Sequence, residues 1–376
     1  MNYDHIIIGA GSMGAAAGCF LAKKGEKVLL LDAYHPPHDA ASHHGETRLI
    51  RFAYGEGEFY VPFALRARDL WKQLEEETGE EIFLQTGIIN VGQADDAFLQ
   101  NVQRSATQFN LPLDVLTAEQ AMAKWPGITL PEPFIACFEP TSGVLKTDQA
   151  ISSYLQLAEQ YGATFKPNTK VVQIEANDEG VVVSTVNGEI YSAKNVIITV
   201  GAWAKDVLAK TGLTLPLRPI RKTFAWYEAD ETLYDRELFP GFAFQLGTES
   251  YYGFPSIEGA GLKVGRHDLG DEINPDDDKA PFGTVAGDKE DLNGFLARFM
   301  PQIGPLKFGK TCMYSMTPDE DFIIDRHPTH QNIIIAAGFS GHGFKFASAV
   351  GEALSELATN KVTTIDLQAF SLQRFQ

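Results

Sequence analysis

Hydrophobic and polar positions along this chain follow two periods, one typical of strands and the other of helices. At the N-terminus an apolar run over 5–8 precedes an alanine-rich stretch to about Lys24, and Gly25 separates this stretch from a second apolar run over 27–31. This order predicts a strand, a helix and a second strand. The same criteria predict further helices over 61–78, 95–109, 117–125, 147–161, 292–299 and 345–358. They predict further strands over 82–92, 134–138, 170–176, 180–186, 189–192, 195–203 and 332–338.

The connection between the first strand and the first helix reads GAGSMG, residues 9–14. Gly9 permits a tight turn, Gly11 lets a pyrophosphate approach the backbone, and Gly14 lets the helix pack closely on the sheet. The free N–H groups at the start of the helix would face the phosphate charge. Asp32 ends the second strand, 18 residues after Gly14, where a carboxylate can accept hydrogen bonds from a ribose. This context predicts an adenine dinucleotide site; the alternative is a glycine-rich turn in an ordinary α/β fold.

Buried, parallel-type strands are predicted near both termini and around 170–200, whereas 216–267 has the alternating and aromatic positions typical of antiparallel strands. We therefore expect an α/β fold in which a discontinuous Rossmann-like nucleotide-binding domain is interrupted by a β-rich antiparallel substrate domain. The nucleotide-binding domain would comprise 1–82, 144–214 and 317–376. The substrate domain would comprise 83–143 and 215–316. Because ligand sites often form where domains meet, we expect the site between them.

Composition narrows the class of protein. The chain has 376 residues, enough for two domains, and its 44% hydrophobic and 21% charged residues are ordinary for a soluble protein. Its net charge of −18 disfavours partners such as nucleic acid or an anionic membrane, and no apolar run approaches the ~20 residues that cross a bilayer. The N-terminus shows no signal peptide, so we expect a cytoplasmic protein. Cys19, Cys137 and Cys312 form no CxxC pair, and we expect neither a disulfide framework nor a metal site.

A second glycine-rich connection lies near the C-terminus, where the predicted strand over 332–338 is followed by FSGHGFK and a helix. Gly338, Gly341 and Gly343 would let a flat ligand approach the backbone, and the helix N-terminus would favour negative charge there. A reduced flavin carries such charge on its N1–C2=O edge, whereas NAD has no comparable need. This favours FAD as the dinucleotide; the alternative is a tight strand-to-helix turn.

Several longer segments carry a more specific signal. They read SHHGETRLIRFAYGEG at 42–57, YYGFPS at 251–256, LKVGRH at 262–267, CMYSMTPDEDFIID at 312–325 and AAGFSGHGFKFAS at 336–348. Together they resemble the monomeric sarcosine oxidase and N-methyl-L-tryptophan oxidase family, over nearly the whole chain. The segments that look more like the N-methyltryptophan oxidases are FAWYEAD at 224–230, PDEDFIID at 318–325 and the terminal RFQ.

The resemblance implies FAD that is attached through a thioether between a cysteine and the flavin 8α carbon. The matching residue is Cys312, and neighbouring cations would favour the thiolate that this attachment requires. From the residues alone, Cys312 would more readily be interpreted as a small buried side chain.

The resemblance also implies roles for a set of polar residues. Arg51 and Lys345 match the pair that holds the substrate carboxylate, which suits the planar fork of Arg and the point charge of Lys. Lys263 matches a lysine implicated in oxygen activation, where a cation would stabilise developing superoxide character. The remaining matches are Arg48 and His44 near the flavin ring, and Tyr252, His267 and Tyr314 around the substrate.

One position departs from the family pattern. Members usually carry His after the second Arg of this loop, in RHAYGEG, whereas this chain carries Phe52. If Phe52 approached the substrate, it would change the polarity of the pocket and with it the substrate preference.

As a function, the resemblance implies a monomeric flavin-dependent oxidase that demethylates N-methyl amino acids, N-methyl-L-tryptophan foremost. With O2 and water, such an enzyme releases the amino acid, formaldehyde and hydrogen peroxide. The substrate would react as the neutral amine, so no side chain would have to act as a strong base. The alternatives are an oxidase for sarcosine or another secondary amino acid, a nicotinamide dehydrogenase, and a non-catalytic FAD-binding module.

Overall fold

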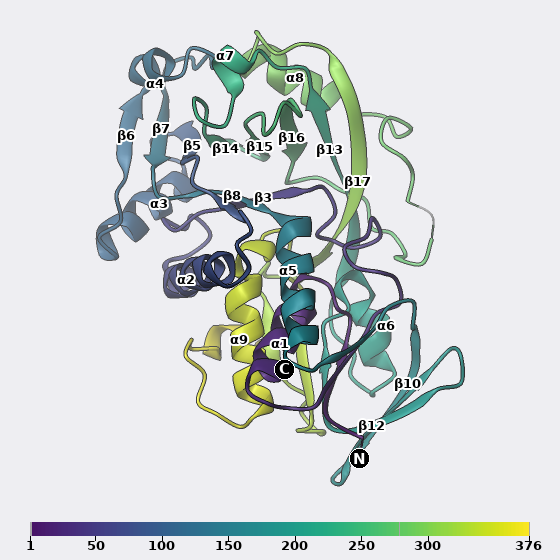
Figure 1. The fold of residues 1–376 in the computed structure, drawn as a ribbon. Coiled ribbons are helices and arrows are strands. Elements are labelled where there is room, and N and C mark those ends of the chain that lie inside the picture. The colour runs from purple at the N-terminus through teal and green to yellow at the C-terminus, as the bar shows by residue number, and fades with distance from the viewer. Residues whose placement is uncertain (1, 278, 376) are drawn as a thin grey trace.

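The described residues form three β-sheets, and helices pack against the two larger ones (Figure 1). The computed structural model describes residues 2–277 and 279–375. Position 1 begins the predicted nucleotide-binding domain, and position 376 ends both that domain and the RFQ motif. Both positions lie outside the described residues. The predicted α/β class is confirmed, and the predicted domain boundaries stay predictions.

The first sheet has eight strands, and its parallel part contains the predicted N-terminal unit. β1 (Tyr3–Ile8) pairs in parallel with β2 (Val28–Leu31) and with the second half of β12 (Ile190–Ile198), and β19 (Ile333–Ala337) follows in parallel beyond β12. The other four strands are β9 (Thr164–Lys166), β10 (Val171–Asn177), β11 (Gly180–Thr185) and β18 (Ile323–Arg326). Because β1, β2, β12 and β19 are parallel, they all end at the same edge of the sheet.

Helices cover both faces of this sheet. On one face α1 (Ser12–Lys23) packs against α5 (Thr147–Gln160) and α9 (Ala347–Ala358), and α2 (Val61–Thr78) packs against α9 (Figure 1). On the other face, Leu208 of α6 (Ala204–Ala209) shares a core with Ile6 and Ile8 of β1. Side chains alternate along a strand, so Ile7 belongs to the core on the opposite face.

The second sheet also has eight strands, in the order β17-β13-β16-β15-β14-β5-β7-β6, and all neighbours are antiparallel except β14 and β5. Its strands are β5 (Ile88–Gln93), β6 (Asp114–Thr117), β7 (Phe134–Glu139), β13 (Arg218–Tyr227), β14 (Gly241–Leu246), β15 (Glu249–Phe254), β16 (Leu262–Arg266) and β17 (Leu306–Met316). The helices in this part are α3 (Ala97–Gln108), α4 (Ala118–Lys124), α7 (Glu231–Tyr234) and α8 (Glu290–Phe299). Phe295 of α8 packs against the rings of Phe242 and Phe244 of β14, so aromatic contacts hold α8 on the sheet.

A small third sheet lies between the two large ones. β8 (Gly143–Lys146) pairs antiparallel with β3 (Thr47–Ile50) on one side and with β4 (Phe83–Leu84) on the other. β3 also contacts β15 and the 3₁₀ turn Phe344–Phe346 that precedes α9. β4 lies in the predicted substrate domain, whereas β8 lies in the predicted nucleotide-binding domain except for its first residue. The pairing of β4 with β8 thus joins the two predicted domains.

The sequence prediction was wrong in how it divided several strands. The run over 82–92 forms two strands, β4 and β5, because the chain turns at Gly87, whose φ is +71°. The runs over 189–192 and 195–203 form one strand, β12, whose first half pairs with β11 and whose second half pairs with β1 and β19. β3, β6, β8, β9 and α6 have at most six residues each, too few to show a period in the sequence.

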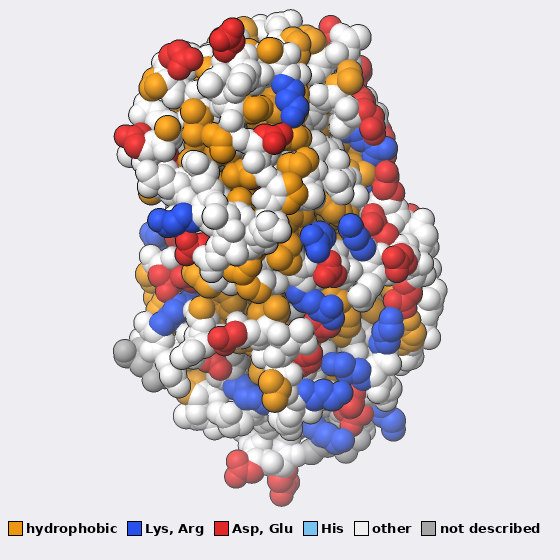
Figure 2. All heavy atoms as spheres, turned by 90° about the vertical axis from the view of Figure 1, so that its left-hand side faces the viewer, with side chains coloured by type: hydrophobic (Ala, Val, Ile, Leu, Met, Phe, Trp, Pro, Cys, Tyr) orange, Lys and Arg blue, Asp and Glu red, His pale blue; other side chains and the backbone are white. Residues whose placement is uncertain are grey.

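The surface seen in Figure 2 carries charges of both signs. Lys and Arg side chains lie among Asp and Glu in its lower half, and apolar side chains are visible in its upper half. The acidic net charge therefore does not make this face uniformly negative. Within the described residues, every helix is too short or too polar to span a membrane.

Candidate active site

A cavity follows the edge of the first sheet at which the parallel strands end. It is lined by Gly9 after β1, Asp32 after β2, Thr199 after β12 and Gly338 after β19, and we call it the strand-end cavity. Its volume is about 250 Å³. In open α/β sheets, nucleotides bind in the crevice outside the carboxyl ends of the strands. The predicted dinucleotide motif therefore lies at the edge where its ligand would bind.

The three glycines of the first loop have different surroundings. A Cβ atom on Gly9, whose φ is +91°, would lie 2.6 Å from the Thr199 carbonyl oxygen, and one on Gly14 would lie 1.9 Å from the Gly9 oxygen. A Cβ atom on Gly11 would meet nothing closer than the His43 ring at 3.6 Å. Gly9 and Gly14 are thus required by packing, whereas a Cβ atom on Gly11 would only touch the His43 ring, and Gly11 lines the cavity in which a pyrophosphate could bind.

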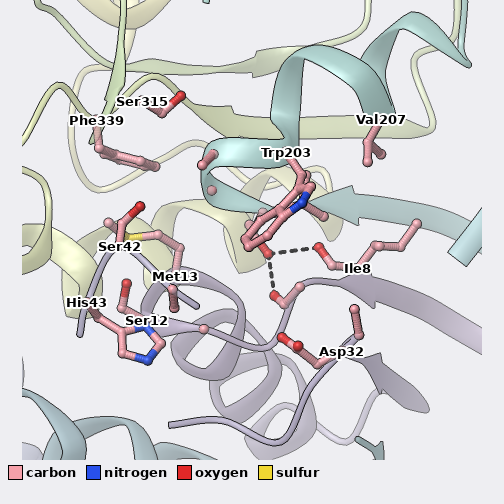
Figure 3. A pocket seen from close by; sticks show the side chains of 18 of the residues that line it. Ile8, Ser12, Met13, Asp32, Ser42, His43, Trp203, Val207, Ser315 and Phe339 are labelled. Carbon is pink, nitrogen blue, oxygen red and sulfur yellow. Dashed lines mark hydrogen bonds between the residues drawn. The ribbon is translucent and has the colours of Figure 1, made fainter. Parts of the chain in front are cut away.

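Asp32 is held in place by the backbone of two loops. Its Oδ2 accepts a hydrogen bond from the Ala10 N–H at 2.8 Å, and its Oδ1 accepts one from the Tyr34 N–H at 2.8 Å. Figure 3 shows its carboxylate at the cavity wall, together with the indole of Trp203. The position suits a carboxylate that accepts hydrogen bonds from a ribose.

Three buried polar atoms on the wall of this cavity have no hydrogen-bond partner among the described residues. They are Nδ1 of His38, Nε2 of His43 and Oγ of Ser315. Burial lowers the pKa of His43 well below its usual value, so its ring is neutral at pH 7. Buried polar groups in proteins normally have partners. A polar ligand would supply them, so the cavity fits a nucleotide cofactor.

The glycines of the C-terminal loop line the same cavity, but for a different reason from the one predicted. Gly338, Gly341 and Gly343 all lie on its wall. A Cβ atom on Gly341 would lie 2.2 Å from the Tyr314 ring, and one on Gly338 or Gly343 would lie 2.4 Å from a neighbouring side chain. These glycines allow the loop to pack on the protein itself, rather than only leaving room for a ligand.

A second cavity, which we call the inner cavity, adjoins the first and has a volume of about 80 Å³. The residues that line both cavities are Arg48, Tyr314, Gly341 and Phe344. The inner cavity is also lined by four other predicted site residues, Arg51, Tyr252, His267 and Lys345. Arg48 comes from β3 and Tyr314 from β17, so a cofactor in one cavity would meet a substrate in the other between these two elements.

Arg51 is buried in the inner cavity and forms an ion pair there. Its Nη2 lies 2.5 Å from Oε1 of Glu56, and its guanidinium lies 5.3 Å from the ring of Tyr54 and 5.2 Å from that of Phe98. Burial by itself would lower the pKa of Arg51, but the Glu56 carboxylate outweighs burial and raises it. Burial would likewise raise the pKa of Glu56, but Arg51 lowers it to about 2. Both groups are therefore charged at neutral pH.

Lys345 lies in the 3₁₀ turn Phe344–Phe346, and its hydrogen-bond partners are neutral. Its Nζ donates hydrogen bonds to the hydroxyl of Tyr54 at 3.0 Å and to the carbonyl of His342 at 2.5 Å. A further hydrogen bond of 2.8 Å joins the Tyr54 hydroxyl to Nδ1 of His342. Burial, together with the charge of Arg51, lowers the pKa of Lys345 to about 7. Without a bound anion, the Lys345 amine is thus only partly protonated at neutral pH.

Lys263 lines neither of these cavities. Its Nζ donates to the carbonyl of Gly45 at 2.5 Å and to Oγ1 of Thr47 at 3.1 Å. The carbonyl of Thr47 also accepts from Lys263 at 3.3 Å and from the Arg48 guanidinium at 2.7 Å, so two cations share one acceptor. Lys263 lines a third cavity, which we call the side cavity and whose wall includes Trp226. Burial, followed by the charge of Arg48, lowers the pKa of Lys263 well below its usual value.

Besides Gly14, two predicted residues are not on a cavity wall. His44 is buried with Nδ1 2.7 Å from Oδ1 of Asp39, and burial lowers its pKa to about 4. Cys312 is 1% exposed and belongs to a buried cluster with Phe224 and Tyr314. Side chains alternate along β17, so Cys312 faces the same side as Tyr314, which lines the strand-end cavity. The Cys312 thiol is therefore the neighbour of Tyr314 on the same face of β17, next to the cavity that Tyr314 lines.

Phe52, the departure from the family pattern, points away from the inner cavity. Its ring packs edge-on against Phe83 at 6.4 Å, and its exposed fraction is 0%. The N–H groups of Phe52 and Ala53 donate to Oε1 of Glu139, at 2.9 and 3.0 Å. This anchor directs Arg51 into the cavity and Phe52 into the core, so Phe52 does not change the polarity of the pocket wall.

Several residues of the site escaped the sequence analysis. Glu56 and His43 lie within the segment quoted for the resemblance, but the sequence shows neither the ion pair of Glu56 with Arg51 nor the burial of His43. Trp203 is the last residue of the strand predicted over 195–203, and the sequence gives no sign that its ring lines a cavity. Lys222 is buried opposite Cys312 and donates to the carbonyl of His267, and no motif marks it.

The fold and these cavities define a class: a nucleotide-dependent oxidoreductase whose cofactor cavity adjoins a small cationic substrate cavity. Comparison with known proteins agrees. The chain belongs to the FAD dependent oxidoreductase family, whose model matches residues 4–357. The predicted cofactor, FAD, and the predicted oxidoreductase activity are thereby confirmed.

The relatives include both branches of the predicted family. The chain is 46% identical to the monomeric sarcosine oxidase of Bacillus sp. (strain B-0618), over 99% of this chain and 96% of the relative. It is 45% identical to the N-methyl-L-tryptophan oxidase of Yersinia pestis (strain Pestoides F), over the full length of both. Among solved structures, L-proline dehydrogenase from P. horikoshii superposes with a TM-score of 0.88 at 25% identity, over 100% of this chain and 98% of that one. The resemblance is confirmed, and the preference for one branch stays a prediction.

Proposed function

We propose that this enzyme oxidises N-methyl amino acids at the methyl carbon, with N-methyl-L-tryptophan as the first candidate substrate. The overall reaction consumes the N-methyl amino acid, O2 and water and yields the amino acid, formaldehyde and hydrogen peroxide. The observation that carries this proposal is the pair of buried cations, Arg51 and Lys345, in a cavity that adjoins the cofactor cavity.

The cation pair suits the carboxylate of an amino acid. Arg51 offers a planar fork for two parallel hydrogen bonds, and Lys345 adds a second charge. Both side chains are buried, where the interaction with a carboxylate is stronger than in water. Held at this end, the substrate would have its amine directed toward the wall shared by both cavities.

The same charges favour the neutral form of the amine. Arg48, Arg51 and Lys345 all line the inner cavity, and a nearby like charge disfavours protonation of a bound amine. Glu56 is the opposing charge, but it is already paired with Arg51. The substrate would therefore lose its amine proton on binding, which frees the lone pair needed for oxidation of the adjacent carbon.

The residues that would hold FAD are distributed along the strand-end cavity. Gly11 and the start of α1 would face the pyrophosphate, Asp32 a ribose, and Arg48 the flavin ring. Bound FAD supplies the two-electron acceptor for the substrate and the site at which O2 is reduced. We further propose that Cys312 tethers it through a thioether, supported by Arg48, Lys263 and Lys279, whose charges oppose the rise in the Cys312 pKa that burial causes.

Lys263 is the proposed cation for oxygen reduction. It is 2% exposed and has only neutral hydrogen-bond partners, the Gly45 carbonyl and the Thr47 carbonyl and hydroxyl. A cation in such a dry site stabilises negative charge that develops on oxygen more than one in water would. The same proposal takes the enzyme to be a cytoplasmic monomer.

Sarcosine is a second candidate substrate because of the size of the inner cavity. Its volume of about 80 Å³ is below the range of roughly 300–1,000 Å³ for pockets that hold drug-sized ligands. A substrate without a large side chain fits this volume best, whereas an indole would require the loop that carries Glu56 to move.

A substrate panel under anaerobic conditions tests the proposal. N-methyl-L-tryptophan or sarcosine should bleach the flavin and form formaldehyde and free amino acid in a ratio of one to one. N-methyltryptamine, which is N-methyl-L-tryptophan without the carboxylate, is the matched control and should bleach it far more slowly. Full flavin loading without bleaching by any N-methyl amino acid would show that the proposed activity is absent.

A further inference from the structure

The side cavity extends to Lys263, which neither the strand-end cavity nor the inner cavity reaches. Its volume is about 390 Å³, and its lining includes Thr47 and Lys263. It shares only Phe254 with the inner cavity and none of its described lining residues with the strand-end cavity. A small molecule in the side cavity could therefore approach Lys263 while the inner cavity holds substrate or product.

Lys263 is a buried cation whose hydrogen-bond partners carry no negative charge. Its Nζ lies 4.5 Å from the ring centroid of Phe254, 4.7 Å from that of Phe224 and 5.1 Å from that of Trp226. No carboxylate of the described residues lies within ion-pair distance of it. The surroundings thus hold the Lys263 amino group in place without an ion-pair partner, so the charge of its protonated form is available to a reacting molecule.

Apart from Thr47, the wall of the side cavity near Lys263 is formed by the rings of Trp226 and Phe254. Trp226, Phe254, Ile257 and Ala260 all contribute to the lining, and Ala260 packs against the buried cluster that contains Trp226. An apolar wall admits a small uncharged solute without a loss of hydrogen bonds. Dioxygen has this character, whereas an amino acid with its charged groups does not.

The outer lining carries more acids than bases. Glu46, Asp148 and Glu258 are exposed, and Lys146 is held by Glu258 at 2.8 Å. Glu46 in turn pairs with Lys310 at 3.1 Å. Like charges repel, so this acidic opening disfavours the substrate carboxylate but has no such effect on dioxygen.

We propose that the side cavity is the path by which dioxygen reaches Lys263, separate from the path of the amino acid. The inference rests on the proposed function, in which Lys263 is the cation that stabilises the negative charge formed as oxygen is reduced. It explains how oxygen can arrive before the product leaves. It also assigns Ala260 and Ile257, from the turn between β15 and β16, to the wall of an oxygen path.

Filling the cavity tests the proposal. Ala260→Phe should narrow the cavity beside Trp226, and Ala260→Ser is the matched control that leaves it open. The flavin is reduced with dithionite, which requires no substrate, and then mixed with buffers of increasing oxygen concentration. Ala260→Phe should lower the second-order rate constant of reoxidation at least fivefold, whereas Ala260→Ser should stay within twofold of the parent enzyme. Anaerobic reduction by the amino acid should be unchanged in both variants.

Xenon gives a readout that does not depend on activity. Crystals of the holoenzyme under xenon pressure should show xenon in the side cavity, because xenon occupies apolar cavities. The xenon peak should be lost in Ala260→Phe and kept in Ala260→Ser. Ile257→Trp provides a second filling variant if Ala260→Phe does not fold.

The outcomes separate this inference from the proposed function. Unchanged reoxidation in a folded, flavin-loaded filling variant would overturn the oxygen path, even if N-methyl amino acids reduce the flavin. If no amino acid reduces the flavin, the proposed function fails, but reoxidation after dithionite still decides the path. A slower reoxidation together with the loss of xenon would support it.

Discussion

The guanidinium of Arg51 lies 2.5 Å from the carboxylate of Glu56, five residues further along the same loop, and both side chains line the inner cavity. A substrate carboxylate that binds Arg51 must therefore share the guanidinium with Glu56 or replace it. This makes Glu56 a competitor for the substrate within the protein itself. The pair also keeps a buried cation neutralised when no substrate is bound.

Replacing Glu56 by Gln should strengthen the binding of simple carboxylates. The change removes a negative charge next to the incoming anion, and one lost like-charge interaction of ~1.4 kcal/mol corresponds to about tenfold in affinity. The dissociation constant of acetate, followed through the flavin spectrum, measures this directly. Weaker binding in Glu56→Gln would mean that Glu56 positions Arg51 rather than competing for it.

Replacing Arg51 by Ala should weaken substrate binding by roughly 30-fold or more, because it leaves a buried carboxylate without its partner. Arg51→Lys should restore part of the affinity, since it keeps the charge but not the planar fork. The double variant Arg51→Ala with Glu56→Gln removes the effect of an unpaired Glu56. An unaltered dissociation constant in the double variant would exclude Arg51 from the substrate site.

Binding of acetate should depend on the protonation of Lys345. Its pKa of about 7 in the free enzyme means that the charged form is present below pH 7 and is lost as the pH rises through this value. Affinity should thus be highest below pH 7 and decline above it. Glu56, His342 and His267 have pKa values of about 2, 3 and 4, so they do not titrate in this range. Lys345→Met should bind acetate weakly and without this pH dependence between pH 6 and pH 9.

Replacing Lys263 by Met should slow flavin reoxidation by O2 much more than anaerobic flavin reduction. The physical reason is that Met keeps the length of the side chain but removes the charge next to the developing negative charge. Stopped-flow spectroscopy separates the two steps. If both steps slow by the same factor, Lys263 has no role specific to oxygen.

Flavin attachment is tested by denaturation. Protein precipitated with acid should remain yellow if Cys312 holds the flavin covalently, and Cys312→Ser should release all the colour into the supernatant. Cys137→Ser is the matched control, because Cys137 is also buried but belongs to a different core, and it should retain the colour. Release of flavin from the parent protein would refute the thioether.

Much of the nucleotide-binding part could be predicted from the sequence because its signals are local. The strand, the GAGSMG loop, the helix and Asp32 follow one another within about thirty residues, and each has a period or a fixed spacing. The resemblance then supplied Arg51, Lys345 and Lys263, which the structure places on the walls of two different cavities.

The features that could not be predicted depend on contacts between distant segments. The ion pair of Glu56 with Arg51 requires the loop to close on itself, and the direction of Phe52 depends on Glu139, 87 residues further along the chain. The short strand β3 has no period of its own and is defined by its partner β8. Such information lies in tertiary packing, and sequence patterns do not contain it.

The small sheet has a consequence for how the enzyme can move. β8 is hydrogen-bonded on one side to β3, which carries Arg48 and Thr47, and on the other to β4, where the chain enters the second large sheet. A hinge between the two halves of the molecule would have to break these ladders. The backbone around the reaction site should therefore stay rigid during turnover. Entry of the substrate and release of the product should depend on movements of loops and side chains alone.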